Sequence, residues 1–263
     1  MADLADSLGI TWLGHSTVLL EANGIRLLTD PLIVPRLGPL RRVVAEPGLI
    51  AAVDAVLVSH VHYDHLDFAS LRRLRSRRFV VPRGAGSILE RRGLRDVVEL
   101  GPEEEMAAGP LTIMGTHAEH KARRGLFGAE IPALGYLVSG PARVYFAGDT
   151  DLFTGMRDLR PHLDVALLPV AGWGSRLGPG HLDPARAAEA LRLLRPRVAI
   201  PIHWGTYRRR GLNRDPAVLR EPAESFARLA AESAPEVRVR ILAPGESAEI
   251  PWATAPVEGG HRR

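Results

Sequence analysis

One short run of sequence constrains this chain more than any other feature. Residues 59–67 read Ser-His-Val-His-Tyr-Asp-His-Leu-Asp and follow an apolar segment, 53–58, that predicts a strand. The run carries four candidate metal ligands, His60, His62, Asp64 and His65. Neutral imidazole nitrogens and carboxylate oxygens are the ligands that zinc and similar cations take in proteins. Because burying so many polar groups without a compensating charge costs free energy, the run predicts a metal site.

The spacing within this run predicts two directions for its side chains. His60 and His62 are two positions apart, so in extended chain they point the same way. Asp64 and His65 lie beyond the bend, point elsewhere and can serve a second ion. The alternative without a metal is that the histidines cap a loop and Asp64 caps the helix expected over 68–74.

The composition is typical of a globular protein with a sizeable core, and it excludes several kinds of site. The chain has 263 residues, of which 46% are hydrophobic and 24% are charged. It has no cysteine, which rules out disulfides, zinc–thiolate sites and thiol nucleophiles. No apolar run is long enough to span a bilayer and no export leader is apparent, so we expect no transmembrane segment and a cytoplasmic location.

The basic charge balance has two interpretations. Lys and Arg number 34 against 30 Asp and Glu, giving a formal net charge of +4 and a pI near 10.0. Much of the excess is arginine in expected helices, such as Arg72, Arg73, Arg91 and Arg92. Solvated helix faces account for these more simply than a nucleic-acid stripe does. We therefore expect no nucleic-acid partner, with a polyanion-binding patch as the alternative.

Short apolar segments alternate with helical ones and predict a mixed α/β (α+β) fold. The expected strands cover 10–13, 17–21, 25–29, 53–58, 79–81, 97–100, 111–114, 134–138, 144–146, 165–168, 198–201, 237–242 and 248–250. The expected helices cover 68–74, 85–92, 151–159, 184–194 and 223–231. Strand runs in each half with helices between them favour two sheets packed face to face with helices outside, a four-layer αββα sandwich.

The same pattern predicts the domain organisation. No linker rich in Gly, Ser or Pro divides the chain, so we expect one domain over residues 1–252. Residues 253–263 are expected to be a disordered tail. The Pro- and Arg-rich stretch 31–47 lacks periodicity and is expected to be a long surface loop, and loops of this length are usually functional.

Further polar side chains follow expected strands, where such folds usually place their binding sites. Asp30, Asp149 and His203 each come after an apolar segment, and His117 and His120 follow another. A single histidine at a strand end is usually structural. Several of them, in a chain with a ligand-rich turn, indicate one shared site.

The order of these residues resembles the metallo-β-lactamase superfamily over essentially the whole chain. The pattern is Asp30, then His60-x-His62-x-Asp64-His65, then His120, Asp149 and His203. Closer phrases are Trp-Leu-Gly-His-Ser-Thr at 12–17, Thr-Asp-Pro at 29–31, Phe-Ala-Gly-Asp-Thr at 146–150, His-Leu-Asp-Pro at 181–184 and Ile-His-Trp-Gly-Thr at 202–206. Within the superfamily these phrases look like the group that contains N-acyl-phosphatidylethanolamine-hydrolysing phospholipase D and the bacterial ascorbate-phosphate lactonases.

The resemblance implies a hydrolase with two divalent metal ions. One ion would be held by His60, His62 and His120, and the other by Asp64, His65 and His203, with Asp149 bridging both. Zinc is the expected metal, and manganese or iron occupies similar sites in the superfamily. A hydroxide between the ions would be the nucleophile, and Asp64 and Asp149 would take part in catalysis through the metals.

The third motif offers two histidines for one ligand position. In the similar group this segment runs Thr-Pro-x-x-His with an Arg four residues later, and here residues 116–120 read Thr-His-Ala-Glu-His, followed by Arg124. Alignment on the Thr and on Arg124 makes His120 the ligand and places His117 where the relatives have proline. His117 would then support the ligands, line the pocket or lie on the surface. Arg124 is carried over as a residue near the ligands or the pocket.

Three further residues are weaker candidates. Asp30 is expected to fix the His-rich turn by hydrogen bonds rather than to bind an ion. His15 lies between two expected strands near the same rim, either as a structural histidine or as part of the pocket. His181 follows a Gly-rich approach and is a candidate catalytic acid or hydrogen-bond donor to the substrate, against the alternative that it packs the loop.

The implied ligand set favours hydrolysis. Diiron oxygen-reducing relatives carry Glu in place of the second His of the turn, whereas this chain has His62. True β-lactamases generally lack the bridging Asp, and one class uses a Cys ligand, so antibiotic hydrolysis is not expected. We expect the substrate to be a phosphodiester, a lactone or a related ester in a small or lipid-like molecule.

Two alternatives stay open at this point. One is a nuclease-type phosphodiesterase, although nuclease relatives usually carry an inserted domain for which this chain has no room. The other is a non-catalytic metal-binding or metal-sensing protein that kept the ligands. The sequence leaves the exact substrate and the oligomeric state open, including a homo-oligomer.

Overall fold

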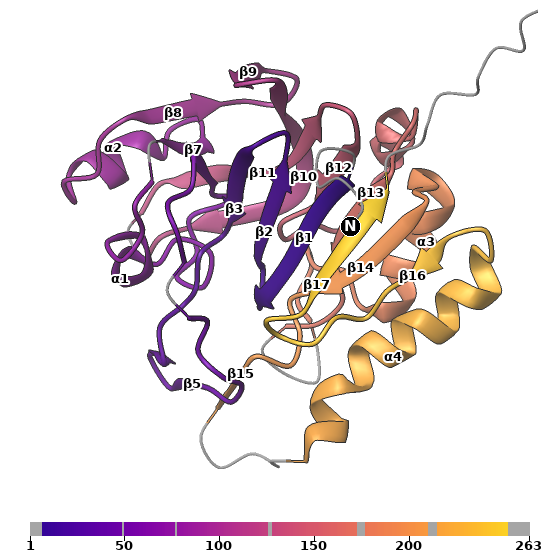
Figure 1. The fold of residues 1–263 in the computed structure, drawn as a ribbon. Coiled ribbons are helices and arrows are strands. Elements are labelled where there is room, and N and C mark those ends of the chain that lie inside the picture. The colour runs from indigo at the N-terminus through magenta and orange to yellow at the C-terminus, as the bar shows by residue number, and fades with distance from the viewer. Residues whose placement is uncertain are drawn as a thin grey trace, which may run out of the picture.

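The protein is represented by a computed structural model that describes residues 7–48, 50–76, 78–125, 128–172, 177–209 and 215–251. Two seven-stranded sheets form the body of the fold, and a small three-stranded sheet lies at its lower end in Figure 1. Among the described helices, none has the length and apolar character needed to cross a bilayer. The expected tail, 253–263, lies outside the described residues.

The first sheet has the strand order β17-β1-β2-β3-β6-β7-β8. Its strands are β1 (Ser7–Gly14), β2 (Thr17–Ala22), β3 (Ile25–Thr29), β6 (Ala55–Leu57), β7 (Phe79–Pro82), β8 (Val97–Leu100) and β17 (Ser247–Pro251). The pairs from β17 to β3 are antiparallel, and those from β3 to β8 are parallel. Parallel neighbours need crossover connections, and the short helices α1 (Phe68–Leu71) and α2 (Gly86–Glu90) lie in two of them.

The second sheet has the order β16-β14-β13-β12-β11-β10-β9. Its strands are β9 (Glu105–Ala108), β10 (Leu111–Arg123), β11 (Glu130–Ser139), β12 (Arg143–Phe146), β13 (Val165–Pro169), β14 (Val198–Ile202) and β16 (Arg238–Val239). The 3-10 helix η2 (Thr154–Leu159) and the helices α3 (Pro184–Leu194) and α4 (Pro216–Ser233) follow its parallel strands. α3 packs on β13, and α4 packs on α3 and β14.

The buried side chains of β3 show why the sheets are stacked. Leu27 belongs to the core between the two sheets, together with Trp12 of β1 and Tyr136 of β11. Its neighbour Leu28 points to the opposite face and packs in a second core with Leu71 of α1. A strand with both faces apolar must be covered on both sides. The expected four-layer αββα sandwich is confirmed.

The third motif differs from its expected structure. His117 and His120 do not follow a strand that ends at residue 114, because β10 continues to Arg123. Pairing with β11 is interrupted between His117 and Lys121, where the register shifts. Such a bulge re-aims side chains without ending the strand. The polar residues of this segment therefore lie inside a strand that is longer than the one predicted from the sequence periodicity.

Two other expectations are wrong in detail. The stretch 31–47 contains the short strands β4 (Arg36–Leu37) and β5 (Leu40–Arg42), and β5 also pairs with β15 (Tyr207–Arg209) to complete the small sheet. This pairing joins segments far apart in sequence, so local periodicity does not reveal it. The expected helix 151–159 is the shorter 3-10 helix η2, which contains Gly155, a poor helix former.

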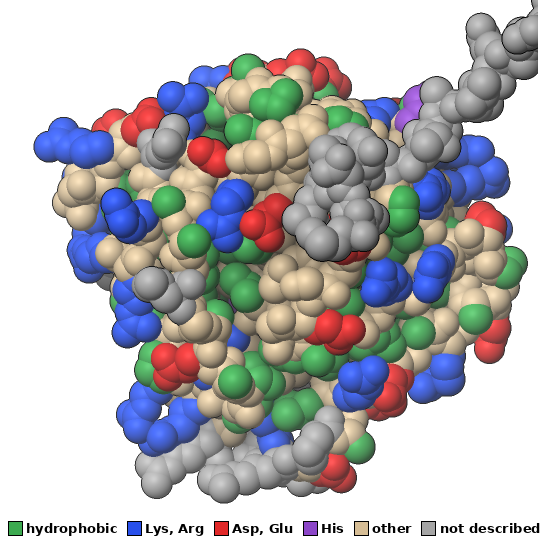
Figure 2. All heavy atoms as spheres, viewed as in Figure 1, with side chains coloured by type: hydrophobic (Ala, Val, Ile, Leu, Met, Phe, Trp, Pro, Cys, Tyr) green, Lys and Arg blue, Asp and Glu red, His purple; other side chains and the backbone are tan. Residues whose placement is uncertain are grey.

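The charged surface is mixed on the face shown in Figure 2, where blue basic and red acidic side chains are interspersed. Arg72, Arg73, Arg91 and Arg92 are exposed, as expected for solvated helix ends. This arrangement agrees with solvated basic residues rather than with one continuous basic stripe on this face.

Candidate metal centre

The structure brings the candidate ligands together at one rim of the two sheets. The donor atoms fall into groups within 4.8 Å of one another, among them His60, His62 and His120, and His15, Asp64, His65 and His203. They come from the turn after β6, the bulge of β10, the β1–β2 turn and the end of β14. The parallel strands β6 and β14, one from each sheet, both end at this rim, and the β1–β2 turn and the bulge of β10 lie beside them.

The first group is a triad of imidazoles. His62 Nδ1 lies 3.0 Å from His60 Nε2 and 3.2 Å from His120 Nε2. On its far side the ring of His120 donates a hydrogen bond from Nδ1 to the carbonyl oxygen of Gly180, at 2.8 Å. This contact leaves Nε2 of His120 as a lone-pair donor aimed at the other two rings. Three such nitrogens are a suitable set of protein ligands for one zinc ion.

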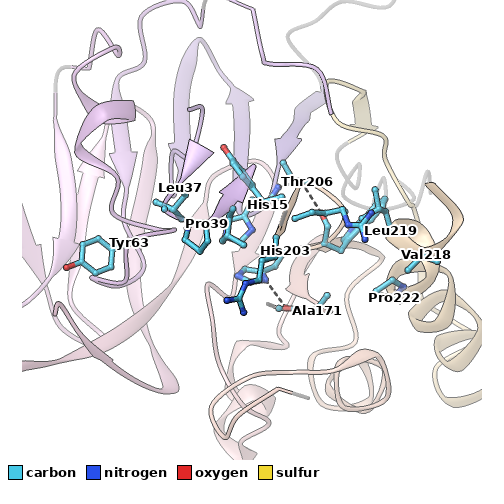
Figure 3. Close-up of a pocket in the computed structure, with 18 residues that line it drawn as sticks. His15, Leu37, Pro39, Tyr63, Ala171, His203, Thr206, Val218, Leu219 and Pro222 are labelled. Carbon is cyan, nitrogen blue, oxygen red and sulfur yellow. Dashed lines mark hydrogen bonds between the residues drawn. The ribbon is translucent and has the colours of Figure 1, made fainter. Parts of the chain in front are cut away.

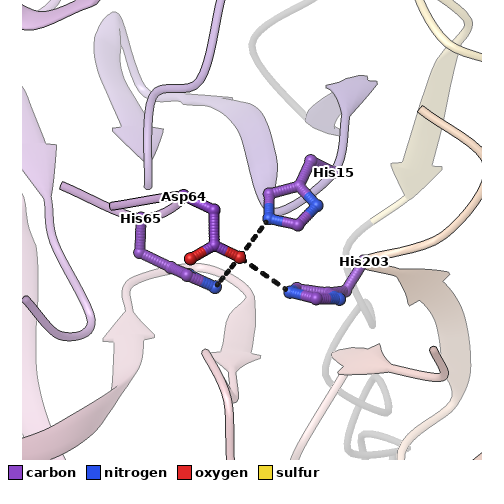
Figure 4. A group of neighbouring side chains, drawn as sticks. All are labelled: His15, Asp64, His65 and His203. Atoms are coloured by element: carbon purple, nitrogen blue, oxygen red, sulfur yellow. Dashed lines mark hydrogen bonds and ion pairs between the residues drawn. The ribbon is translucent and has the colours of Figure 1, made fainter. Parts of the chain in front are cut away.

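The second group surrounds one carboxylate oxygen, as Figure 4 shows. Asp64 Oδ2 lies 3.2 Å from His15 Nε2, 3.5 Å from His65 Nε2 and 3.7 Å from His203 Nε2. Ligands about 2.1 Å from a tetrahedral ion are roughly 3.4 Å from one another. The spacing is therefore that of atoms arranged to share a cation.

Asp149 lies between the two groups. Its Oδ2 is 3.2 Å from His65 Nε2 and 3.9 Å from His60 Nε2, and its Oδ1 is 3.5 Å from His203 Nε2. Asp149 directly follows Gly148, which has a φ of 61° and comes so close to Ser59 that a Cβ on Gly148 would lie 2.5 Å from the Cβ of Ser59. Only glycine lets this loop approach the His-rich turn so closely.

Asp30 supports the His-rich turn from behind. It is fully buried, and its Oδ2 accepts hydrogen bonds from Nδ1 of His65 at 2.6 Å and from the hydroxyl of Ser59 at 2.5 Å. Its Oδ1 accepts the backbone N–H of Ser59 at 2.7 Å. Asp30 is thus occupied by the turn, as the sequence indicated, and it holds Nε2 of His65 toward Asp149.

Burial and neighbouring charges set the protonation of the group. Burial lowers the pKa of His120 to about 4 and that of His15 to about 3, which keeps both rings neutral near pH 7. Burial alone would raise the pKa of Asp149, but His203 and His65 hold it well below its usual range. Neutral imidazoles and ionised carboxylates are the forms that bind metal ions.

Strained backbone occurs at three of these positions. His15, Asp30 and His203 have φ values of 53°, 31° and 63°, a region that non-glycine residues seldom adopt. The backbone of His15 is fixed in this conformation by contacts on both sides: its N–H donates to Thr206 Oγ1 at 2.6 Å, and its carbonyl accepts the N–H of His203 at 2.9 Å. Strain of this kind persists where the surroundings define the geometry, as they do at functional sites.

The remaining candidates lie at different places around the centre. His181 Nε2 is 3.6 Å from Asp149 Oδ2, and its side chain is 27% exposed, so it lies at the open edge of the group. His117 points away, is 54% exposed and pairs with Glu119 at 3.3 Å. Arg124 lies behind the turn and donates from Nη1 to two backbone carbonyl oxygens, those of Val61 at 2.9 Å and Leu66 at 2.8 Å.

The donor set fits metal ions. Among the described residues, neither His65 Nε2 nor Asp149 Oδ1, both of them buried, makes a hydrogen bond. A buried polar atom without a partner is costly unless something else satisfies it, and a cation between these atoms would do so. The charges agree as well, since the ionised carboxylate of Asp149 and the neutral ring of His120 suit divalent cations such as zinc.

A cavity of about 1070 Å³ opens beside the centre and has His15 and His203 in its wall. Figure 3 shows Leu37 and Pro39 on one side of these histidines and Leu219 on the other. Sequence reasoning pointed to His15, His203 and Trp204 of this wall and missed its other residues. The only signal was the length of the stretch 31–47, which was expected to be functional.

Comparison with known proteins connects this centre to a family. The β-lactamase superfamily domain family matches residues 25–204 of the chain. A UPF0173 metal-dependent hydrolase from Caldivirga maquilingensis is 31% identical over 92% of this chain and 98% of its own length. The N-acyl-phosphatidylethanolamine-hydrolyzing phospholipase D 1 of Caenorhabditis elegans is 32% identical over 75% of this chain and 64% of its own length.

A solved structure agrees with this relationship. Igni18, described as a novel metallo hydrolase from the hyperthermophilic archaeon Ignicoccus hospitalis, is similar with a TM-score of 0.72 and 25% sequence identity. The similarity covers 94% of this chain and 100% of the Igni18 chain. The two sheets and the helices outside them are therefore shared along nearly the whole length.

Proposed function

Because this chain belongs to the β-lactamase superfamily domain family, we propose that it is a hydrolase with two metal ions that cleaves a phosphodiester, a lactone or a related ester bond. The observation that carries the proposal is the position of Asp149, whose two carboxylate oxygens face donor atoms of both ligand groups. A carboxylate in that position suits a bridge between two cations.

Each of the two ligand groups would hold one ion. His60, His62 and His120 would hold the first, and Asp64, His65 and His203 would hold the second. Zinc fits the imidazole and carboxylate donors best, and manganese or iron fits the same ligand types. When bound, the ions would supply the Lewis acidity that produces a hydroxide nucleophile near neutral pH and that stabilises negative charge on the substrate.

The protein groups have complementary tasks around that chemistry. Asp149 and Asp64 would balance the positive charge of the ions, while Asp30 fixes the ring of His65 by a hydrogen bond. His181, at the open edge and 3.6 Å from Asp149, is in place to donate a hydrogen bond or a proton to the substrate's leaving group. Its Nδ1 lies 3.2 Å from the carbonyl oxygen of Gly178, which leaves Nε2 to face the site.

The proposal is tested by activity that depends on metal. Protein purified without added metal is analysed for its metals, stripped with a chelator and reloaded with Zn, Mn or Fe. Each form is then assayed with bis-p-nitrophenyl phosphate, p-nitrophenyl esters and chromogenic lactones. Turnover that disappears on stripping and returns on reloading is expected. A fully loaded protein that is inert toward every substrate would instead favour the metal-sensing alternative.

A further inference from the structure

A second cavity, of about 640 Å³, lies behind the His-rich turn. The residues that line it come from the turn and the start of α1, from α2 and its ends, and from the hairpin of β10 and β11. Tyr63 borders both cavities, and in Figure 3 it lies at the edge of the labelled residues, away from His203. None of the described candidate metal ligands lines this second cavity, so it lies outside the metal centre.

The second cavity has an excess of positive charge. Its lining includes three arginines, Arg91, Arg92 and Arg124, and one carboxylate, that of Asp67. The carboxylate is already in use, because its Oδ2 accepts hydrogen bonds from the backbone N–H and the hydroxyl of Ser70, each at 2.7 Å. Among the described residues, no ion pair neutralises the guanidinium of Arg91 or that of Arg92. The cavity therefore attracts anions.

Arg124 contributes an open pair of hydrogen-bond donors. Its Nη1 donates to the carbonyl oxygens of Val61 and Leu66 and so holds the turn. Its Nε and Nη2 make no hydrogen bond to the described residues, and neither atom is closed off from solvent. These two nitrogens form one edge of the planar guanidinium, which matches two oxygens of a carboxylate or a phosphate. One edge of Arg124 thus binds the protein, and the other is open for a ligand.

Arg92 and Arg124 share one aromatic ring. The guanidinium carbon of each lies 4.8 Å from the ring centroid of Phe68. Each contact is favourable by itself, but together they bring two positive charges near each other. Burial lowers the pKa of Arg124 from its ordinary value, and the charge of Arg92 lowers this pKa further. An anion with two negative charges beside both guanidinium groups would offset this repulsion and would use the open donors.

We propose that this cavity, the arginine cavity, binds the doubly charged phosphate group of a small ligand. Nε and Nη2 of Arg124 hold two of the phosphate oxygens, and Arg92 and the exposed Arg91 balance the charge. A carboxylate has one charge and would leave more of the positive charge unbalanced. The ligand is a second molecule rather than the one cleaved at the metal centre, because none of the described candidate metal ligands lines the arginine cavity. Its phosphate group belongs either to free phosphate or to a phosphate ester.

The test uses metal-loaded protein and three probes at about pH 8: inorganic phosphate, phenylphosphonate and benzoate. At this pH the two phosphorus probes carry close to two negative charges, whereas benzoate has the ring of phenylphosphonate with a single charge. Calorimetry at constant ionic strength measures the affinity and the number of sites. Each titration is repeated after the metals are stripped with a chelator, which removes binding at the metal centre and leaves the arginine cavity.

The variants are Arg92→Gln, Arg92→Lys and the matched control Arg73→Gln. Arg92 is exposed, so its replacement should leave the fold intact, and thermal melting checks this. Arg73 is an exposed arginine just after α1 that does not line the arginine cavity. Its replacement removes the same charge from the same outer layer of the molecule.

We expect one phenylphosphonate site that remains after stripping and that Arg92→Gln weakens roughly tenfold, the range for loss of a charged partner. Arg92→Lys should keep part of the affinity, because it retains the charge without the guanidinium geometry, and Arg73→Gln should change little. Benzoate should bind roughly tenfold more weakly than phenylphosphonate. Tighter binding of phenylphosphonate than of inorganic phosphate would identify a phosphate ester as the ligand. Equal or tighter binding of inorganic phosphate would identify free phosphate.

Three results would each overturn the proposal. They are the loss of all binding when the metals are removed, an unchanged affinity in Arg92→Gln, and benzoate binding as tight as that of phenylphosphonate. Failure of the proposed hydrolase function would appear differently, as a protein that is inert in the ester assays while its phosphate binding and the effect of Arg92→Gln persist.

Discussion

His65 and Asp30 form a buried pair in which Nδ1 of the imidazole donates to Oδ2 of the carboxylate across 2.6 Å. Both side chains are fully buried. The pair sets the tautomer of His65, because a proton on Nδ1 leaves Nε2 as the lone-pair donor that faces Asp149 and Asp64. Burial alone would lower the pKa of His65, but Asp149, Asp64 and Asp30 raise it well above its ordinary value. A metal-free centre should thus hold a proton at His65 that a cation would displace.

Asp30→Asn should weaken metal binding by about 10- to 100-fold, the usual effect of removing a carboxylate behind a histidine ligand. Asn tolerates the positive φ of 31° at this position, so the change tests the charge and the hydrogen bond rather than the backbone. Competition with a chromophoric chelator measures the affinity. Asp96→Asn is the matched control, because Asp96 also has a positive φ, 56°, but lies at the surface beside Arg78. Equal metal affinities of Asp30→Asn and Asp96→Asn would show that Asp30 does not support His65 as a metal ligand.

His120→Ala should lower metal occupancy far more than His117→Ala. The ring of His120 contacts His62 at 3.2 Å, whereas His117 is exposed and pairs with Glu119. Elemental analysis of the two purified variants decides between them. Loss of metal in the His117 variant with retention in the His120 variant would mean that the register of the third motif is wrong by three residues.

Arg124→Met should destabilise the fold by about 1–2 kcal/mol, since two hydrogen bonds from a charged donor are lost and the side chain is only half-buried. Nη1 of Arg124 joins the carbonyl oxygens of Val61 and Leu66, which flank the ligand-rich part of the turn. Arg123→Met is the control, because Arg123 is 53% exposed and its ion pair with Glu130 is distant, at 3.8 Å. Urea unfolding measures the free energy of unfolding of both variants. Equal stability of the two would show that Arg124 does not stabilise the turn through these hydrogen bonds.

Alkaline pH should destabilise the protein through a tyrosine of the core. Burial raises the pKa of Tyr145 well above its ordinary value of 10.0. Above about pH 10 the unfolded chain loses this proton and the folded chain keeps it, so the free energy of unfolding falls as the pH rises further. Tyr145→Phe should reduce that fall, and Tyr63→Phe, at a residue that is 55% exposed, should not. Thermal melts between pH 9 and about 11.5 compare them; a wild-type pH dependence that both variants share would contradict the assignment.

The parts of the centre that lie close together in the sequence were predictable. The candidate ligands in the turn after β6 lie within a few positions of one another. Asp149 and His203 each come shortly after an apolar strand, β12 and β14, that the run of apolar residues predicts. The alternation of strands and helices likewise gave the four layers, because both faces of β3 and its neighbours are apolar. The one-domain organisation over 1–252, the cytoplasmic location and the absence of a nucleic-acid partner stay predictions.

Features that depend on long-range pairing were not predictable. The partner of His15 is Asp64, 49 residues away, and nothing local to either residue indicates the contact. The pairing of β15 with β5 places Arg208 opposite Arg41 and in the cavity wall, although the local sequence resembles any basic surface segment. The strand β10 was too short in the prediction, because its polar ligands at a bulge look like the start of a loop.

The most direct measurement of the central claim is the number of metal ions bound per chain by the wild type and by Asp149→Asn, with elemental analysis after equilibration in excess metal. The amide keeps the shape of the side chain but removes the negative charge and one good oxygen donor, so the two cations would repel with no bridge between them. We expect two ions in the wild type, at most one in the variant and a loss of turnover in the variant with little change in its fold. One ion in the wild type under metal excess, or two ions and normal turnover in Asp149→Asn, would contradict the bridged two-metal centre.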